Sequence, residues 1–227
     1  MKKHIARISL TFALIVSACS ATAEAQPSIR IGAEGGLAIS SLKYTPEVFA
    51  GSTRNGMVIG IVGEVSLNNI LAIQISPRYM EKGKSLGTFT ITGDAGPEAL
   101  GTYEAFEKLD YYEVSAIAVA KLPATLISPH AFVGACVGHL ASATVNLPSS
   151  TTQRSDDQDI KDRFESSDVC IDFGAGVEYQ LSPLLGVRID GRYSLGLTNI
   201  WKSDPTSIYE SAKSNSIQIT LGALVSI

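Results

Sequence analysis

The chain has 227 residues, of which 45% are hydrophobic and 18% are charged, and its formal net charge is −4. Such an acidic chain lacks the excess of lysine and arginine that neutralises phosphates, which excludes nucleic acid as a partner. The length suits a single β domain, and no repeat of the solenoid or propeller kind is present.

The first predicted element is a secretory signal peptide over residues 1–25. Lys2, Lys3 and Arg7 form its positively charged start, and an apolar stretch follows up to Ala18. A membrane-spanning helix needs about 20 apolar residues, and neither this stretch nor any later segment is that long. Cleavage would remove three of the 18 basic and one of the 22 acidic residues, which leaves a net charge of −6. We therefore expect residues 26–227 to form one exported domain.

The end of the signal offers two cleavage sites. "AEA" (residues 23–25) has the small residues that signal peptidase requires, and it stands at the usual distance from the apolar stretch. The alternative is a lipobox, "VSAC", which would leave a lipidated Cys19 at the mature N-terminus. We expect cleavage after Ala25, which leaves two cysteines in the mature chain.

Eight β-strands are predicted in the mature chain, because its dominant hydrophobic period is two. In the last strand, for example, Ile217, Ile219 and Leu221 alternate with Gln218 and Thr220. The faces of the fourth and fifth strands alternate less clearly. In chain order the strands cover residues 29–40, 57–67, 71–79, 109–122, 130–141, 168–179, 185–197 and 216–227.

The connections between these strands alternate in length. Short connections cover residues 68–69, 123–129 and 181–183, whereas residues 42–55, 82–108, 143–166 and 198–214 form long, polar connections. Outer-membrane barrels have short periplasmic turns and long extracellular loops. The fold class is therefore predicted as all-β, an eight-stranded antiparallel up-and-down transmembrane β-barrel.

The polar strand faces are rich in glycine and in acid–base pairs, and almost free of lysine. A narrow lumen needs such pairs, because buried charges are tolerated only in partnership. The residues predicted to form this lumen charge network are Glu34, Glu64, Arg78, Asp172, Glu178, Arg188, Asp190 and Arg192. The alternative is a soluble periplasmic, lipocalin-like barrel that binds an apolar ligand inside. It requires the opposite arrangement, with Phe173, Val187 and Ile219 facing inward.

Five segments resemble the PorT-like outer-membrane β-barrel domain family, a group of small OmpA/OmpX-type barrels. They are "GAEGGLAISSL" (32–42), "LAIQISPRYMEKGKSL" (71–86), "LDYYEV" (109–114), "FGAGVEYQL" (173–181) and "RYSLGLTNI" (192–200). The resemblance covers nearly all of the mature chain. It implies a small outer-membrane barrel without enzymatic activity, and some members are linked to protein secretion.

Two residues depart from the expected pattern. The chain ends in Ile227, where outer-membrane barrels usually carry an aromatic residue for the insertion machinery. Pro77 lies inside a predicted strand, although proline cannot donate a ladder hydrogen bond. We expect a bulge at Pro77, or a ladder that ends early toward the outer loop.

Cys136 and Cys170 lie on the fifth and sixth strands. If paired residues of this hairpin have numbers that sum to 306, the two cysteines are directly opposite, and Ser142 is opposite Phe164. The sequence leaves two alternatives: a disulfide, which suits an oxidising compartment, or a pair of packed thiols.

No catalytic, cofactor-binding or metal site is predicted. The lumen carboxylates fit a salt-bridge network better than a general acid–base pair, and His130 and His139 lack further metal ligands at suitable spacing. Asp156, Asp157, Asp159 and Asp162 lack the glycine and spacing of a calcium loop. Aromatic residues near the outer strand ends are expected to form a girdle at the lipid interface, with an adhesive surface as the alternative; they are Tyr44, Tyr103, Phe106, Tyr111, Tyr112, Trp201 and Tyr209.

The sequence therefore predicts an outer-membrane protein with a structural, adhesion or assembly-partner role, acting through its outer loops. It is not expected to be an enzyme. Its expected partners are outer-membrane lipid, the barrel-insertion machinery, and envelope or secretion proteins or extracellular ligands that contact the loops.

Overall fold

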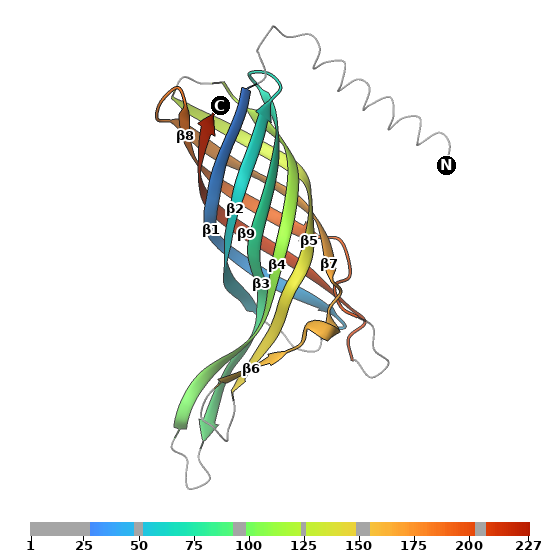
Figure 1. Cartoon of the computed structure of the whole chain (residues 1–227). Coiled ribbons are helices and arrows are strands. Elements are labelled where there is room, and N and C mark those ends of the chain that lie inside the picture. Colours follow the sequence, from blue (N-terminus) through green and yellow to red (C-terminus); the bar gives the residue numbers. More distant parts are fainter. Residues whose placement is uncertain (1–27, 48–51, 93–98, 124–125, 149–154, 203–207) are drawn as a thin grey trace, which may run out of the picture.

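A computed structural model describes residues 28–47, 52–92, 99–123, 126–148, 155–202 and 208–227 (Figure 1). The predicted signal peptide, with both of its cleavage sites, lies outside the described residues. Among those residues, no helix has the length and apolar character needed to cross a membrane.

Nine strands and one short 3₁₀ helix make up the described secondary structure. The strands are β1 (Ser28–Thr45), β2 (Ser52–Ser66), β3 (Leu71–Thr92), β4 (Ala99–Lys121), β5 (Ile127–Pro148), β6 (Ser155–Asp159), β7 (Ser167–Gln180), β8 (Leu185–Gly196) and β9 (Ser211–Ser226). The helix, η2 (Lys161–Arg163), lies between β6 and β7.

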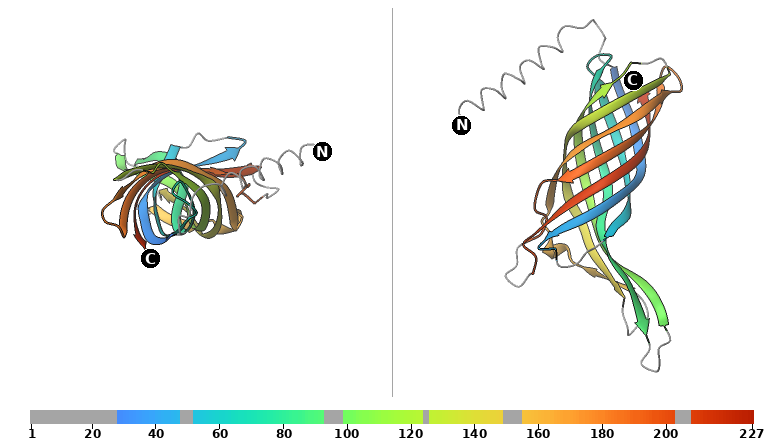
Figure 2. Two further views of the ribbon diagram at one scale, coloured as in Figure 1. Left: turned by 90° about the horizontal axis from the view of Figure 1, so that it is seen from above. Right: turned by 180° about the vertical axis from the view of Figure 1, so that it is seen from behind.

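Eight of the strands close into an antiparallel ring in the order β1-β2-β3-β4-β5-β7-β8-β9, and β9 pairs with β1. Strand β6 is outside the ring and pairs only with the outer end of β5. The view along the barrel shows the closed ring (Figure 2). These findings confirm the predicted eight-stranded barrel. The short turns and the C-terminus share one end, which is the periplasmic end by the usual rule for such barrels.

Apolar side chains cover the outer wall and charged side chains fill the interior. Ile219 is 55% exposed and Phe173 is 45% exposed, whereas Arg188 and Asp190 are almost fully buried. A soluble barrel requires the opposite arrangement, so the lipocalin-like alternative is wrong. The outward apolar residues of β1 run from Ile29 to Ile39, which matches the roughly 9–11 residues that a tilted transmembrane strand needs.

The lipid-facing wall gives a direct test by charge insertion. Leu221 lies near the middle of the apolar band, where it pairs with Gly35 and Ile189, and its side chain is 61% exposed. We expect Leu221→Arg to lower the free energy of unfolding by about 2–4 kcal/mol, the cost of arginine at the bilayer midplane. Urea titration in lipid vesicles would measure the loss. The control Asp162→Arg, on the exposed η2, should leave stability unchanged, and an equal loss in both variants would contradict a lipid-facing Leu221.

The long third connection is mostly strand, not loop. Residues 82–108 were predicted as a loop, but β3 continues to Thr92 and β4 begins at Ala99. The buried side chains at the start of this segment, Lys82, Lys84 and Ser85, are polar, so the apolar alternation that marks a spanning strand is lost there. The β3–β4 pairing has a register shift between Ser85 and Gly87. Gly87 has a φ of 107° there, a conformation that glycine adopts without a steric penalty.

Pro77 interrupts the β2–β3 pairing without a bulge. Gly60 pairs with Arg78 and Gly63 pairs with Ile75, so the register is the same on both sides of the proline. The prediction of a bulge or an early ladder end at Pro77 is therefore wrong. The register shift of this strand pair lies further out, between Thr53 and Val58. The missing proline donor is accommodated by the loss of local pairing alone.

Candidate functional site

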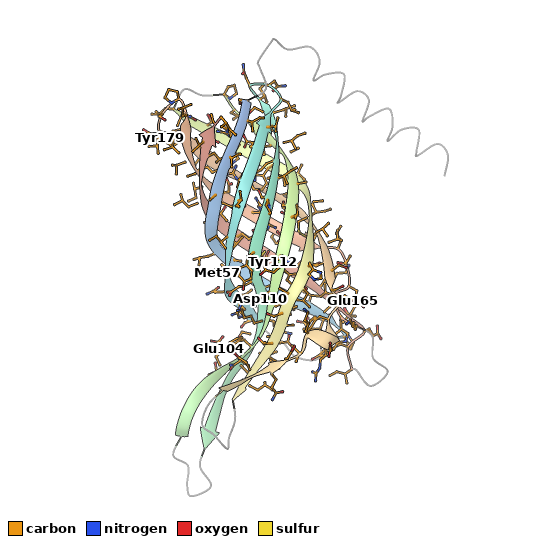
Figure 3. The ribbon with its side chains drawn as sticks, viewed as in Figure 1. Met57, Glu104, Asp110, Tyr112, Glu165 and Tyr179 are labelled. Atoms are coloured by element: carbon orange, nitrogen blue, oxygen red, sulfur yellow. A yellow bond between two sulfur atoms is a disulfide. The ribbon has the colours of Figure 1, made fainter. Side chains whose placement is uncertain are left out.

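Aromatic residues mark both edges of the lipid-facing wall. Tyr112 lies at the outer edge, near Met57, and Tyr179 lies at the periplasmic edge (Figure 3). At the outer edge Tyr79 pairs with Tyr112, and Tyr112 pairs with His139. Amphipathic rings favour this depth because one end is apolar and the other reaches water.

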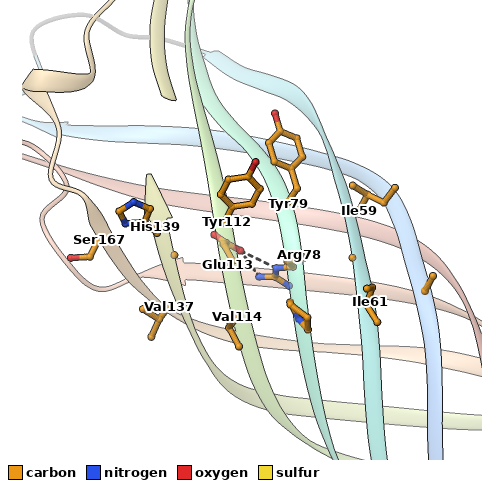
Figure 4. Close-up of a pocket in the computed structure, with 14 residues that line it drawn as sticks. Ile59, Ile61, Arg78, Tyr79, Tyr112, Glu113, Val114, Val137, His139 and Ser167 are labelled. Carbon is orange, nitrogen blue, oxygen red and sulfur yellow. Dashed lines mark hydrogen bonds and ion pairs between the residues drawn. The ribbon is translucent and has the colours of Figure 1, made fainter. Parts of the chain in front are cut away.

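A groove of about 900 Å³ crosses the outer wall just inside this edge (Figure 4). Ile59, Ile61, Val114 and Val137 contribute apolar side chains to it, and it lies where Pro77 interrupts the β2–β3 pairing. Its position on the lipid-facing wall makes it a surface for acyl chains.

The periplasmic third of the lumen is organised around Arg30. Its guanidinium donates to Glu64 and to both carboxylate oxygens of Glu178, and the distance from Nη2 to Glu178 Oε2 is 2.9 Å. Lys121 Nζ lies 2.6 Å from Glu64 Oε1. One arginine and one lysine therefore neutralise two buried carboxylates contributed by strands on different sides of the barrel.

The middle of the lumen is organised around Arg188 of β8. Arg188 pairs with Glu34 at 3.2 Å and with Asp190 at 3.1 Å. Asp190 also lies 2.7 Å from Nε2 of His130. His130 is thus held in place by a lumen carboxylate.

The outer third of the lumen is centred on Asp172. Arg78 and Arg192 lie 3.1 Å and 3.3 Å from its Oδ2, and Ser115 donates to the same oxygen at 2.7 Å. Arg78 also pairs with Glu113 at 2.8 Å. A further cation, Lys82, lies 2.7 Å from Glu113 and 2.9 Å from Asp168.

The structure places all eight residues of the predicted charge network inside the barrel and brings each within ion-pair distance of an opposite charge. Sequence reasoning missed six further members of this network, namely Arg30, Lys82, Glu113, Lys121, His130 and Asp168. The paired charges fill the lumen from one end to the other, which leaves the interior a polar core.

Cys136 and Cys170 are joined by a disulfide across the β5–β7 hairpin, with a Cα–Cα distance of 5.1 Å. Both are buried in the lumen beside Asp172. Since the sulfurs are bonded to each other, this cluster offers no free thiolate to a metal. The predicted register is confirmed along this hairpin, but its ladder ends at His139–Ser167. The predicted pairing of Ser142 with Phe164 is therefore wrong, and Phe164 bridges to Trp201 instead.

A compact apolar cluster, which we call the outer cap, closes the outer end of the barrel. Its centre is aromatic: Trp201 packs edge-to-face on Tyr44 and on Phe164, with ring centroids 5.6 Å and 5.2 Å apart. The remaining buried members are Leu42, Leu109, Tyr111, Leu140, Ala143, Val145, Ile160, Ile200 and Ala212. The cap joins β1, β4, β5 and β9 to the segments around η2 and residue 200.

The outer cap corrects the expectation of an aromatic girdle. Tyr44, Tyr111 and Trp201 were expected in the girdle but are buried in the cap. Tyr112, also expected in the girdle, faces lipid and is 63% exposed. The side chain of Tyr103 lies outside the described part. The Tyr44 hydroxyl donates to Glu107 at 2.7 Å, and burial of this carboxyl raises the pKa of Glu107 above its usual value.

The acidic loop residues serve the local hairpin. Asp157 accepts a hydrogen bond from Asn146 across the β5–β6 pair, and Asp159 accepts one from the backbone N–H of Lys161. Asp162 is exposed on η2, and the side chain of Asp156 is not among those described. The described carboxylates, those of Asp157, Asp159 and Asp162, form no cluster that could hold a metal ion, which agrees with a solvated loop.

The comparisons with known proteins agree with this architecture. The family model described as "Outer membrane protein beta-barrel domain" matches residues 24–202. Neisserial surface protein A superposes with a TM-score of 0.50 at 13% identity, over 88% of this chain and 99% of that chain. OprG from Pseudomonas aeruginosa superposes with a TM-score of 0.51 at 8% identity, over 87% and 95%. No curated protein matches the sequence.

The two structural likenesses show the fold alone, because their sequence identities are low. The family match covers well over half of the chain, and its members are outer-membrane barrels. The localisation predicted from the sequence is therefore confirmed, as are the transmembrane strands. The chain belongs to the outer membrane protein β-barrel domain family.

Proposed function

We propose that this outer-membrane barrel is a non-catalytic anchor that presents its outer hairpins to an adhesion or assembly partner. The observation that carries the proposal is the ribbon formed by β3 and β4. Its pairing continues from Met80–Tyr111 to Thr92–Ala99, which is roughly 40 Å along the strand beyond the aromatic edge. A barrel that served only to span the membrane would not need such an extension.

The outer edge of the ribbon is suited to binding. Strand β2 pairs with β3 only as far as Ser85, so in the described part the backbone edge of residues 87–92 carries no neighbouring strand. An unpaired edge accepts an extended peptide by strand addition. The ion pairs in the described part of the lumen support the same proposal, because they occupy the space that a pore would need.

The proposal extends to the kind of partner and to the way the protein is held in the membrane. Resemblance to the PorT-like group supports an envelope or secretion protein as partner, and cleavage after Ala25 would leave the barrel without a lipid anchor.

A shortened ribbon tests the proposed role. Residues 86–105 would be replaced by Asn-Gly, a turn that closes a two-residue hairpin. We expect the variant to insert normally, as judged by heat-dependent gel mobility. Cells that express it should lose the attachment to one another and to protein-coated surfaces that the full chain confers. If attachment and envelope integrity both equal those of the full chain, the ribbon is not the binding element.

A measurement of channel conductance tests whether the barrel is an anchor or a pore. The full-length barrel and the shortened variant would each be inserted into planar bilayers. We expect no stepwise conductance from either of them. Regular conductance steps from the full-length protein would overturn the anchor proposal in favour of a pore.

A further inference from the structure

Two lysines face each other on the outer wall of the barrel. Lys43 of β1 pairs directly with Lys213 of β9, and both side chains are exposed on the same face as Ile39 and Ile217. Like charges directly opposite each other destabilise a strand pair. Neither lysine has an ion pair or hydrogen bond with any residue that the structure describes. An anionic group from outside the chain could therefore relieve the repulsion between the two lysines.

The depth of this pair in the membrane follows from the ladder of β1. The exposed apolar pair Ile39–Ile217 comes first, then Ser41–Asn215, and then Lys43–Lys213. Four residues beyond Ile39 correspond to about 13 Å along the strand, or roughly 9 Å along the normal of the bilayer at a 45° tilt. This depth is that of the lipid headgroups in the outer leaflet.

The lysines line a groove that is polar at one end and apolar at the other. Its volume is about 370 Å³, and its lining includes Thr45 and Ser211, the next pair outward. Leu195 and Leu197 of β8 form the apolar side, at 38% and 45% exposed. Two cations and two hydroxyls beside a leucine surface match a phosphate that is attached to an acyl chain.

We propose that this groove binds an anionic, phosphate-bearing lipid of the outer leaflet. The phosphate lies between the Lys43 and Lys213 ammonium groups, and the proximal part of an acyl chain lies on Leu195 and Leu197. Binding would remove the repulsion across the β1–β9 pair, which closes the barrel. Basic pockets at headgroup depth recognise anionic lipids through this combination of charge and apolar contact.

Lipid titration by native mass spectrometry tests the site. The full-length barrel in mild detergent would be titrated with short-chain phosphatidic acid, and separately with phosphatidylcholine of the same chain length. We expect clear preference for phosphatidic acid, and about 30-fold weaker binding of it in Lys43→Gln/Lys213→Gln. The charge-conserving variant Lys43→Arg/Lys213→Arg should keep the wild-type affinity.

The control is Lys161→Gln/Lys202→Gln, which removes the same charge from the exposed surface of the outer cap. It should bind phosphatidic acid like the wild type, and all variants should show the gel mobility of a folded barrel. Equal loss in both double variants would overturn the proposal, since binding would then follow net charge. Equal affinity of the wild type for the two lipids would overturn it too. Full displacement by inorganic phosphate at an equal concentration would show an anion site without a lipid component, and would overturn the lipid assignment.

Discussion

Replacing Asp172 by asparagine should lower the free energy of unfolding by about 3–5 kcal/mol, which is the usual cost of removing one partner from a buried ion pair. Asp172 is fully buried and accepts hydrogen bonds from Arg78, Arg192 and Ser194. The substitution keeps the shape of the side chain but leaves two buried guanidinium groups without their shared carboxylate. Urea titration in detergent micelles, followed by gel mobility, would measure the loss.

Asp162→Asn is the matched control for that variant, because it makes the same chemical change on the exposed η2. It should change stability by less than about 0.5 kcal/mol. If Asp172→Asn fails to insert, Ser194→Ala removes a single donor to Asp172 and should cost about 1 kcal/mol. Wild-type stability in Asp172→Asn would contradict the central place of this residue in the network.

The barrel and eight of the fourteen residues of its charge network were predictable because every residue of a spanning strand follows one rule. A side chain in the ring meets either lipid or the lumen, so more exposed and buried side chains alternate through β8 and from Ser216 onward in β9. Arg188, Asp190 and Arg192 could therefore be placed in the lumen from their positions alone. Loop lengths supplied the orientation, since short connections gather at the periplasmic end.

Two of the missed lumen residues, Lys82 and Glu113, lie where that rule is hidden. Lys82 falls in a segment that was predicted as a loop, since the strand continues beyond the apolar pattern. Glu113 follows the adjacent aromatics Tyr111 and Tyr112, which point to opposite faces. The β4–β5 register shifts between Asp110 and Tyr111. Two consecutive large rings obscure a period of two, and a register shift cannot be read from one strand.

The outer cap could not be predicted from periodicity at all. Its members come from segments far apart in the chain, and contacts such as Phe164 with Trp201 join loops without a repeating pattern. The sequence positions of the aromatic residues at the outer strand ends fit an interfacial girdle and a packed core equally well. Only the three-dimensional path of the loops separates the two, because it decides whether a ring at the strand end turns toward lipid or over the lumen.

Removing the disulfide should cost about 3–4 kcal/mol of stability, because the bond closes a long loop in the unfolded chain. The bonded cysteines are 34 residues apart, and the chain-entropy estimate for such a loop is about 3–4 kcal/mol. Cys136→Ser/Cys170→Ser suits the test, since both positions are buried beside Asp172 and serine hydroxyls can donate to that carboxylate. Urea titration without reductant would compare the variant with the wild type.

Reductant is the internal control for this comparison. It should lower the unfolding midpoint of the wild type toward that of the double variant, and leave the double variant unchanged. Folded wild type should resist reduction, because Cys136 and Cys170 are only 2% and 1% exposed. Two reactive thiols in wild type denatured without reductant would contradict the disulfide and support the alternative of packed thiols. In that case the stability of the β5–β7 hairpin would rest on its ladder and on the Asp172 network alone.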